Sequence, residues 1–224
     1  MDFHYEKVLE IDCSTMIRLG RVTDGGKWIC NPWRLRRNPN CVLYSFGVDG
    51  ETSFEMALMK ISNGSCALFA FDPAEDSGEV FDGQSRMFFF PYELSGVSDA
   101  GEKQYSLHDI MVKLGHTFID ILKIDIEGAE YEGLSSVLAT NNKPIACQIL
   151  VEFHEWRNES SETLFKEWND LMHLFSQAKY LLFSKEPNHS GPGDFYEYGY
   201  IHNDCLEFFG LSSDLIIQKN FPQV

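Results

Sequence analysis

Short apolar runs alternate along the chain with segments whose apolar residues recur at helical spacing. From residue 41 onward the runs predict strands at 41–46, 66–71, 87–90, 118–126, 145–153, 180–184 and 196–202. The helical spacing predicts helices at 53–60, 107–114, 130–138 and 161–178. Alternating strands and helices are typical of an α/β fold in which a mostly parallel sheet has helices on both faces. We therefore predict a seven-stranded sheet that ends in an antiparallel C-terminal hairpin.

The first forty residues do not follow this alternation. We expect residues 1–40 to form an N-terminal extension that packs on or caps a domain spanning 41–224. Within it, the segment from Met16 to Leu19 is predicted to form a short helix. Ser53 is the expected N-cap of the first helix of the domain, because a Ser side chain can accept a hydrogen bond from the first helical turn.

A run of ten residues, Ile121–Glu130, begins as a buried strand and ends as a cluster of charge. Its carboxylates Asp125, Glu127 and Glu130 repel each other and lose hydration if they lie at the end of a central strand. In open α/β sheets, ligands bind beyond the carboxyl ends of the strands. The run therefore predicts a ligand site, and the alternative is a plain strand followed by a helix whose first turn favours Glu.

A second polar group ends the predicted strand at 145–153. Alternation puts Glu152 and His154 on one side, where they would lie next to Asp125 and Glu127 of the neighbouring strand. A His beside carboxylates has a raised pKa and can exchange protons near neutral pH. The same four groups could instead bind a divalent metal, although we assign no residue to a metal site. In a third interpretation the His is only the partner of a structural acid.

The loop after the first strand of the domain contains Gly47 and Gly50 but no G-x-G-x-x-G motif. Acidic Glu51 replaces the third glycine. A pyrophosphate at the following helix would meet Asp49 and Glu51, which argues against NAD or ATP and favours a cationic or zwitterionic ligand.

Two later loops complete the candidate site. Asp72 ends the second strand, where an acid can accept both hydroxyl groups of a ribose; the alternative is an Asp that turns the chain into Pro73. Ser98 and Asp99 follow the third strand and could face an adenine edge, although a plain surface turn is the favoured interpretation of this segment in isolation.

The charge and hydropathy of the chain exclude some partners. Its 34 acidic and 18 basic side chains give a net charge of −16, so the surface repels phosphate backbones and nucleic acid is not an expected partner. There is no run of 18 apolar residues, so we predict no membrane span. The first residues also lack the basic start and apolar run of a signal peptide.

The six cysteines fit no zinc-binding spacing. Cys30 and Cys41 flank a loop rich in Pro and Arg and could pair, whereas Cys66 and Cys147 are predicted to be buried small hydrophobic residues. Three Asn-x-Ser sequons occur, at Asn63, Asn158 and Asn188. These features slightly favour a secretory, lumenal or extracellular location over the cytoplasm.

Four segments carry a resemblance to a known family. They are Tyr44–Gly47, Phe69–Pro73, Leu122–Glu130 and Leu150–His154, and the similarity runs from about residue 28 to about residue 201. In this order they resemble the FkbM-type class I S-adenosylmethionine-dependent methyltransferases and the animal methyltransferase-like proteins related to them. The resemblance implies a Rossmann-like methyltransferase fold and S-adenosylmethionine as the cofactor.

The resemblance also implies roles for individual residues. Ser45, Phe46 and Gly47 would contact the methionine end of the cofactor, Asp72 the ribose, Ser98 and Asp99 the adenine, and Asp125 and Glu127 the region of the sulfonium. Glu152 and His154 would lie near the methyl acceptor, a hydroxyl- or carboxylate-bearing molecule, and the implied reaction is O-methylation.

The catalytic residues expected on this basis are Asp125, His154, Glu152 and Lys123. Asp125 or His154 would serve as general base, and Lys123 would neutralise an acid or contact a carboxylate. The sequence departs from the family pattern at Ser45, where an acid is usual, and at Glu51. A catalytically inactive binding protein on the same fold is therefore the alternative. A nucleotide-sugar or nicotinamide enzyme is disfavoured by the acidic loop.

Overall fold

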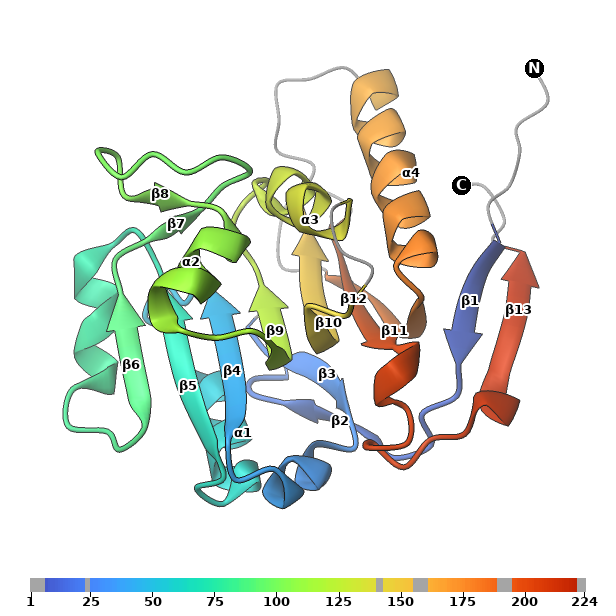
Figure 1. Ribbon diagram of the computed structural model, residues 1–224, viewed down its shortest axis with the longest axis horizontal. Helices are drawn as coiled ribbons and strands as arrows, with labels where there is room; N and C mark the ends of the chain where they lie inside the picture. The colour runs from blue at the N-terminus through green and yellow to red at the C-terminus, as the bar shows by residue number, and fades with distance from the viewer. Residues whose placement is uncertain (1–6, 23–24, 140–142, 155–160, 189–194, 221–224) are drawn as a thin grey trace.

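The computed structural model describes residues 7–22, 25–139, 143–154, 161–188 and 195–220. Its centre is one nine-stranded sheet (Figure 1). The strands follow the spatial order β13 (Ile216–Asn220), β1 (Lys7–Ile11), β11 (Tyr180–Asn188), β12 (Phe195–His202), β10 (Ala146–Phe153), β9 (Ile119–Ile124), β4 (Cys41–Phe46), β5 (Cys66–Phe71) and β6 (Met87–Phe90). The predicted count of seven is wrong, because β1 and β13 extend the sheet beyond β11.

The pairing of the strands confirms the predicted topology. From β6 to β10 all neighbours are parallel, whereas β12 is antiparallel to both β10 and β11 and forms the predicted C-terminal hairpin. Every residue of β9 and β10 is buried, as expected for parallel strands covered on both faces.

Helices cover both faces of the sheet, as predicted (Figure 1). One apolar cluster contains side chains of α2 (Leu107–Leu114), α3 (Glu130–Leu138) and α4 (Ser161–Gln177), among them Leu134, Leu171 and Phe175. The cluster on the other face contains Phe54 and Leu58 of α1 (Ser53–Ser62) and lies under the N-terminal hairpin. The helical faces of both sets therefore agree with the apolar spacing in the sequence.

The N-terminal region contributes strands, and the helix predicted at Met16–Leu19 is wrong. This segment is β2 (Met16–Leu19), paired antiparallel with β3 (Lys27–Cys30). Four residues are too few for a stable isolated helix, whereas in a hairpin their backbone groups form hydrogen bonds with the neighbouring strand. The described part of residues 1–40 thus supplies β1 to the main sheet and the β2–β3 hairpin to one of its faces.

The start of α1 also differs from the prediction. The N-cap residue is Thr52, and Ser53 is the first helical residue. The hydroxyl of Ser53 instead accepts a hydrogen bond from the backbone N–H of Arg21 at 2.9 Å, which ties the β2–β3 hairpin to the helix.

All six cysteines form disulfides. The prediction that Cys66 and Cys147 are buried is confirmed, whereas the pairing considered for Cys30 and Cys41 is wrong. The bonds are Cys13–Cys30, Cys41–Cys66 and Cys147–Cys205. Parallel register explains one of them, because Cys41 and Cys66 are direct partners on β4 and β5 with Cα atoms 4.2 Å apart.

A short arm follows the edge strand β6. It has two strands, β7 (Glu93–Leu94) and β8 (Gln104–Tyr105), spans residues 93–105 and is called here the β7–β8 arm (Figure 1).

Of the three sequons, Asn63 is exposed at the turn after α1, and Asn158 lies outside the described residues. None of the helices described is both long enough and apolar enough to cross a membrane.

Candidate active site

The site lies where the direction of the sheet connections reverses. The chain leaves β4 for β5 and β6 on one side, while β9 and β10 lie on the other. Such a switch point opens a crevice beyond the carboxyl ends of the two central strands. Gly47 follows β4 and Asp125 follows β9 at this point, and Glu152 and His154 stand at the end of β10.

The structure brings His154 together with the carboxylates predicted to surround it. Its Nε2 atom lies 3.7 Å from Asp125, 3.8 Å from Glu127 and 3.8 Å from Glu152. Its Nδ1 atom is 2.6 Å from Oε1 of Glu130, which is completely buried. Burial disfavours the imidazolium, but the hydrogen bond to Glu130 and the surrounding carboxylates outweigh it and raise the pKa of His154 to about 9.

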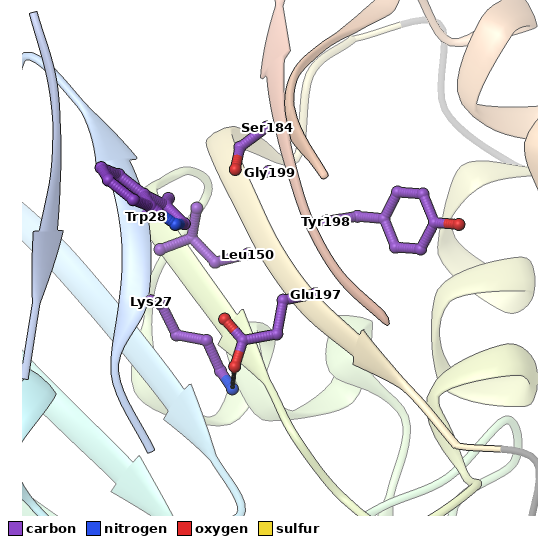
Figure 2. Close-up of a pocket in the computed structure, with 7 residues that line it drawn as sticks. All are labelled: Lys27, Trp28, Leu150, Ser184, Glu197, Tyr198 and Gly199. Carbon is purple, nitrogen blue, oxygen red and sulfur yellow. Dashed lines mark hydrogen bonds and ion pairs between the residues drawn. The ribbon is translucent and has the colours of Figure 1, made fainter. Parts of the chain in front are cut away.

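A lysine that the sequence analysis did not select occupies the centre of the same group. Nζ of Lys27, at the start of β3, lies 2.7 Å from Glu152, 3.0 Å from Asp125 and 3.0 Å from Glu197. Figure 2 shows Lys27 and Glu197 pointing towards one another from facing strands. Burial alone would lower the pKa of Lys27, but the three carboxylates outweigh it and raise that pKa well above its ordinary value.

Two acids that face Lys27 respond to it differently. Burial would raise the pKa of Asp125, but Lys27 and Lys123 outweigh it and hold that pKa below the ordinary range. Burial raises the pKa of Glu197 to about 7 despite the nearby cation. The site therefore contains one acid that is firmly ionised and one that exchanges its proton near neutral pH.

Lys123 lies beneath this group, where it connects the ends of β4 and β9. Its ammonium donates to the backbone carbonyl of Gly47 at 2.7 Å, and it lies 3.8 Å from Glu55 and 3.9 Å from Asp125. Glu55 is buried in α1 and accepts a hydrogen bond of 2.5 Å from the hydroxyl of Ser45. A carboxylate from α1 thus stands beside the position where the sequence has Ser45 in place of the usual acid.

Gly47 is required by its close approach to the neighbouring strand. Its φ is +73°, and a Cβ atom there would lie 1.6 Å from the carbonyl oxygen of Asp125. The carboxylate of Asp72 supports the same loop, because Oδ2 accepts from the N–H groups of Val48 at 2.9 Å and Asp49 at 2.8 Å. Its other oxygen accepts from Ala74 at 2.9 Å. Both oxygens of Asp72 shape the loop, and its role at a ribose stays a prediction.

Of the remaining predicted contacts, Phe46 adjoins this group through its backbone carbonyl, which accepts a hydrogen bond from the N–H of Asp125 at 3.2 Å, whereas Ser98 and Asp99 lie apart from it. Phe46 is buried, with its ring stacked on Phe71 at a centroid distance of 4.4 Å. Ser98 and Asp99 lie in the β7–β8 arm, where Ser98 bonds to Ser106 and Asp109 and where Asp99 is exposed. None of the hydrogen bonds found in the described ranges links these two residues to Asp125.

A family comparison decides what kind of site this is. A family model described as a methyltransferase domain matches residues 2–202. The chain belongs to this family of methyltransferase domains. The resemblance to S-adenosylmethionine-dependent methyltransferases that the motifs predicted is therefore confirmed.

Individual relatives are more distant. The human probable methyltransferase-like protein 24 is 27% identical over 169 residues, which cover 70% of this chain and 45% of the relative. The rat protein of the same name is 26% identical over 214 residues, covering 84% and 58%. The chain spans about half the length of the curated relatives it matches. Among solved structures, methyltransferase FkbM from Methylobacillus flagellatus KT has a TM-score of 0.49 at 14% identity, covering 72% of this chain and 44% of that one.

In this methyltransferase domain, the potential metal ligands are Asp125, Glu152 and His154, whose ligand atoms lie within 4.8 Å of one another. Mixed carboxylate and imidazole donors suit a divalent transition metal. The ammonium of Lys27 already contacts both carboxylates, however, and supplies positive charge at the place where a cation would act.

Sequence reasoning overlooked Lys27, Glu55 and Glu197. Glu197 had a detectable signal, because an acid stands between aromatic residues in the strand Phe195–His202. Glu55 and Lys27 had none, since the first resembles any helix-surface acid and the second follows two glycines in a region without helical or strand periodicity.

Proposed function

We propose that this domain transfers a methyl group from S-adenosylmethionine to an oxygen atom of an acceptor. The observation that carries the proposal is the group formed by Lys27, Lys123, Asp125, Glu152 and His154, called here the charged cluster, at the carboxyl ends of β9 and β10. Its position at the switch point of a methyltransferase-family sheet supports a role in catalysis.

The carboxylates at this site suit a cationic ligand. Carboxylates of Asp125, Glu127 and Glu152 face the same region, and the Glu127 side chain is 75% exposed. The side of Gly50 is also open, because a Cβ atom there would meet nothing within 4 Å. When bound, S-adenosylmethionine supplies a methyl group on a positively charged sulfur, which becomes a neutral thioether after transfer. The carboxylates therefore favour binding of the charged cofactor over binding of its neutral product.

The acceptor must lose its proton as its oxygen forms the new bond to carbon. Asp125 and His154 are the candidate bases, and they differ in protonation at neutral pH. With its pKa raised to about 9, His154 holds its proton at pH 7, whereas Asp125 is ionised. A rate that rises with pH up to about 9 would assign the base role to His154, and a rate that is flat from pH 6 to 9 would assign it to Asp125.

An inactive binding protein is the weaker alternative. It rested on Ser45 and Glu51, which depart from the family pattern. Glu55 places a carboxylate against Ser45, and Glu51 accepts from the N–H of Ser53 at 2.7 Å and pairs with Arg21. Both departures therefore have local partners in the fold, which supports a retained site over a decayed one.

The first test is a thermal-shift titration with S-adenosylmethionine and S-adenosylhomocysteine, with and without EDTA. Ligand at 100 times its dissociation constant stabilises by about 2.7 kcal/mol, which corresponds to roughly 5–10 °C for a domain of this size. A shift that disappears in EDTA would add a metal to the site. A hydroxyl and carboxylate acceptor screen, read as formation of S-adenosylhomocysteine, follows. No shift at millimolar ligand would overturn the proposal.

We also propose that the chain folds in an oxidising compartment, secretory, lumenal or extracellular. The three disulfides support this, because such bonds persist where thiols are not kept reduced. Alkylation of protein isolated from its native source under denaturing, non-reducing conditions should modify no cysteine. Modification of several cysteines would contradict the proposal.

A further inference from the structure

One modification motif lies entirely within the described residues and has no part in the proposed methyl-transfer site. It is the sequon formed by Asn63, Gly64 and Ser65, whose Asn-x-Ser pattern is an acceptor for N-linked glycans. Of the other two sequons, Asn158 lies outside the described residues, and Asn188 ends β11 with the last residue of its sequon outside them. The surroundings of Asn63 can therefore be compared with what a glycan requires.

The sequon forms the turn between α1 and β5. Asn63 is the C-cap residue of α1, with φ +53° and ψ +43°, and Gly64 follows with φ +79°. Both residues are exposed, and a Cβ atom on Gly64 would meet nothing within 4 Å. Within the described part of the chain, the side-chain amide of Asn63 forms no hydrogen bond with another residue. A bulky group on this amide therefore has room outside the fold and displaces no partner.

We propose that Asn63 carries an N-linked glycan. The donor is an oligosaccharide joined to a lipid through a diphosphate. The amide nitrogen of Asn63 forms a bond to the anomeric carbon of the first sugar and loses a proton to a base of the transferase. The bond from that carbon to the diphosphate oxygen breaks, and the lipid diphosphate leaves with the electron pair. This inference goes beyond methyl transfer, and it rests on the oxidising compartment proposed above.

The conformation of the turn accounts for only part of the motif. Asn or Gly is favoured at a left-handed C-cap, so the backbone of Asn63 has a local explanation. The same turn needs only the backbone of Ser65, whose N–H donates to the carbonyl of Ser62 at 3.2 Å. The hydroxyl of Ser65 donates to the carbonyl of Arg36 at 3.2 Å, at an exposed place where water can replace it. A hydroxyl at this position is thus required by the glycan motif and not by the turn.

The turn lies at the end of the sheet opposite the charged cluster (Figure 1). It precedes β5, which is parallel to β4, and β4 is parallel to β9. β5 has six residues, which at about 3.3 Å each span about 20 Å. Asn63 therefore stands at the amino ends of strands that have Asp125 at their carboxyl ends. A glycan on Asn63 leaves the proposed cofactor side of the sheet open.

The turn does not depend on a glycan for its shape. Cys66 follows it directly and is bonded to Cys41 on the neighbouring strand. Arg86 donates to the carbonyl oxygens of Cys66 at 3.0 Å and of Ser65 at 3.3 Å. We therefore expect the protein to stay folded after enzymatic removal of the glycan and after substitution of Asn63, so that both can be used as tests.

The first test maps Asn63 in the unsubstituted full chain, directed through the secretory pathway of cultured eukaryotic cells. Protein from the medium or the membrane-enclosed fraction is treated with peptide N-glycosidase in heavy-oxygen water, which converts a glycosylated Asn to a labelled Asp. Mass spectrometry should find the label at residue 63 in most chains. An unmodified Asn63 in protein with its three disulfides intact would overturn the proposal.

Matched variants separate the motif from the turn. In a background without the other two acceptors, Asn158→Gln/Asn188→Gln, one step in gel mobility that peptide N-glycosidase removes should remain. Asn63→Gly keeps the left-handed C-cap and should abolish the step, as should Ser65→Ala. Ser65→Thr keeps the hydroxyl that the motif requires and should retain it. A step that persists in Asn63→Gly would place the glycan elsewhere and overturn the assignment.

The same mapping on protein from the native source separates this inference from the proposals on which the rest of the function depends. A native chain with free cysteines would refute the oxidising compartment and the glycan together, whereas disulfide-bonded native protein with an unmodified Asn63 would refute the glycan alone. The thermal shift with S-adenosylmethionine should be the same before and after removal of the glycan. A shift that changes on removal would contradict a glycan at the far end of the sheet, and the absence of any shift would overturn methyl transfer while the mapping still decides the glycan.

Discussion

The charged cluster and the β7–β8 arm both contain residues expected to contact the cofactor, Asp125 in the cluster and Ser98 and Asp99 in the arm, yet the two regions are built differently. In the cluster, Lys27 and His154 are buried and lie among several carboxylates at fixed distances. In the arm, Asp99 is exposed and Ser98 is partly exposed. Their side chains form hydrogen bonds only with residues close in sequence among those described: Gly101 within the arm, and Ser106 and Asp109 at the start of α2. The methyl-transfer end of the proposed site is thus preorganised by buried charge, whereas the adenine end would depend on a surface segment.

This difference predicts that substitutions in the cluster have the largest effects. Asp125→Asn and His154→Ala should each lower kcat by about 10²- to 10⁴-fold, because each removes a candidate base beside the acceptor. The measurement is formation of S-adenosylhomocysteine with an acceptor from the screen. His108→Ala is the control, since that ring is exposed on α2. Full turnover in both cluster variants would remove the cluster from the mechanism.

Substitution of Gly47, in the backbone beneath the charged cluster, should have the next largest effect. Gly47→Ala is expected to lower the free energy of unfolding by about 3 kcal/mol or more, because it adds a backbone clash to an unfavourable positive φ. Gly50→Ala is the matched control: its φ is +68°, but a Cβ atom meets open space. Its cost should be only about 1–2 kcal/mol. Equal losses in denaturant unfolding would show that the approach to Asp125 is unimportant.

The buried charges should also make stability depend on pH. Because the pKa of His154 is raised to about 9, the folded protein binds this proton more tightly than the unfolded chain. The resulting stabilisation, up to ~3 kcal/mol, is complete below about pH 6.5 and is lost as pH rises through about 9. Unfolding in urea at pH 6, 7.5 and 9 measures it, and His154→Gln should flatten this part of the profile.

Glu197 should make stability depend on pH in a second, lower pH range, which serves as an internal control. Its pKa is raised to about 7, so its contribution is present below its ordinary pKa and is lost as pH rises through about 7. Glu197→Gln should remove the slope between about pH 4.5 and 7 while leaving the alkaline slope of His154 in place. A single slope that vanishes in both variants would mean that the two groups titrate as one unit.

The smallest effects are expected in the arm. Ser98→Ala and Asp99→Asn should change the free energy of unfolding by no more than about 0.5 kcal/mol, because both residues lie near the surface. If they flank the adenine as predicted, cofactor affinity should fall by roughly five- to tenfold, the equivalent of one lost hydrogen bond. Isothermal titration calorimetry would measure this. Unchanged affinity would mean that the arm is a surface feature outside the cofactor site, and the proposed site would then rest on the charged cluster.

Local patterns were sufficient for most of the architecture. The strands Cys41–Phe46 and Cys66–Phe71 and the helices Leu107–Leu114 and Glu130–Leu138 have the predicted boundaries. Each is a long apolar run or a strongly periodic segment whose conformation depends mainly on burial of its own side chains. The short segment Met16–Leu19 was wrong because its pairing partner, not its own sequence, decides its conformation.

The candidate site, too, was predicted from the sequence only in part. The order of residues along the chain and the rule for the carboxyl ends of parallel strands were enough to select Asp125, Glu152 and His154 as neighbours. Chain order could not show that Cys41 pairs with Cys66, since that depends on strand register. It also could not show that Lys27, 125 residues from Glu152 in sequence, donates a hydrogen bond to it. Sequence by itself determined the family, the sheet topology and the carboxylate and imidazole groups at its edge. Only the tertiary structure decided which cation neutralises them, because a buried charge finds its partner through packing between distant segments.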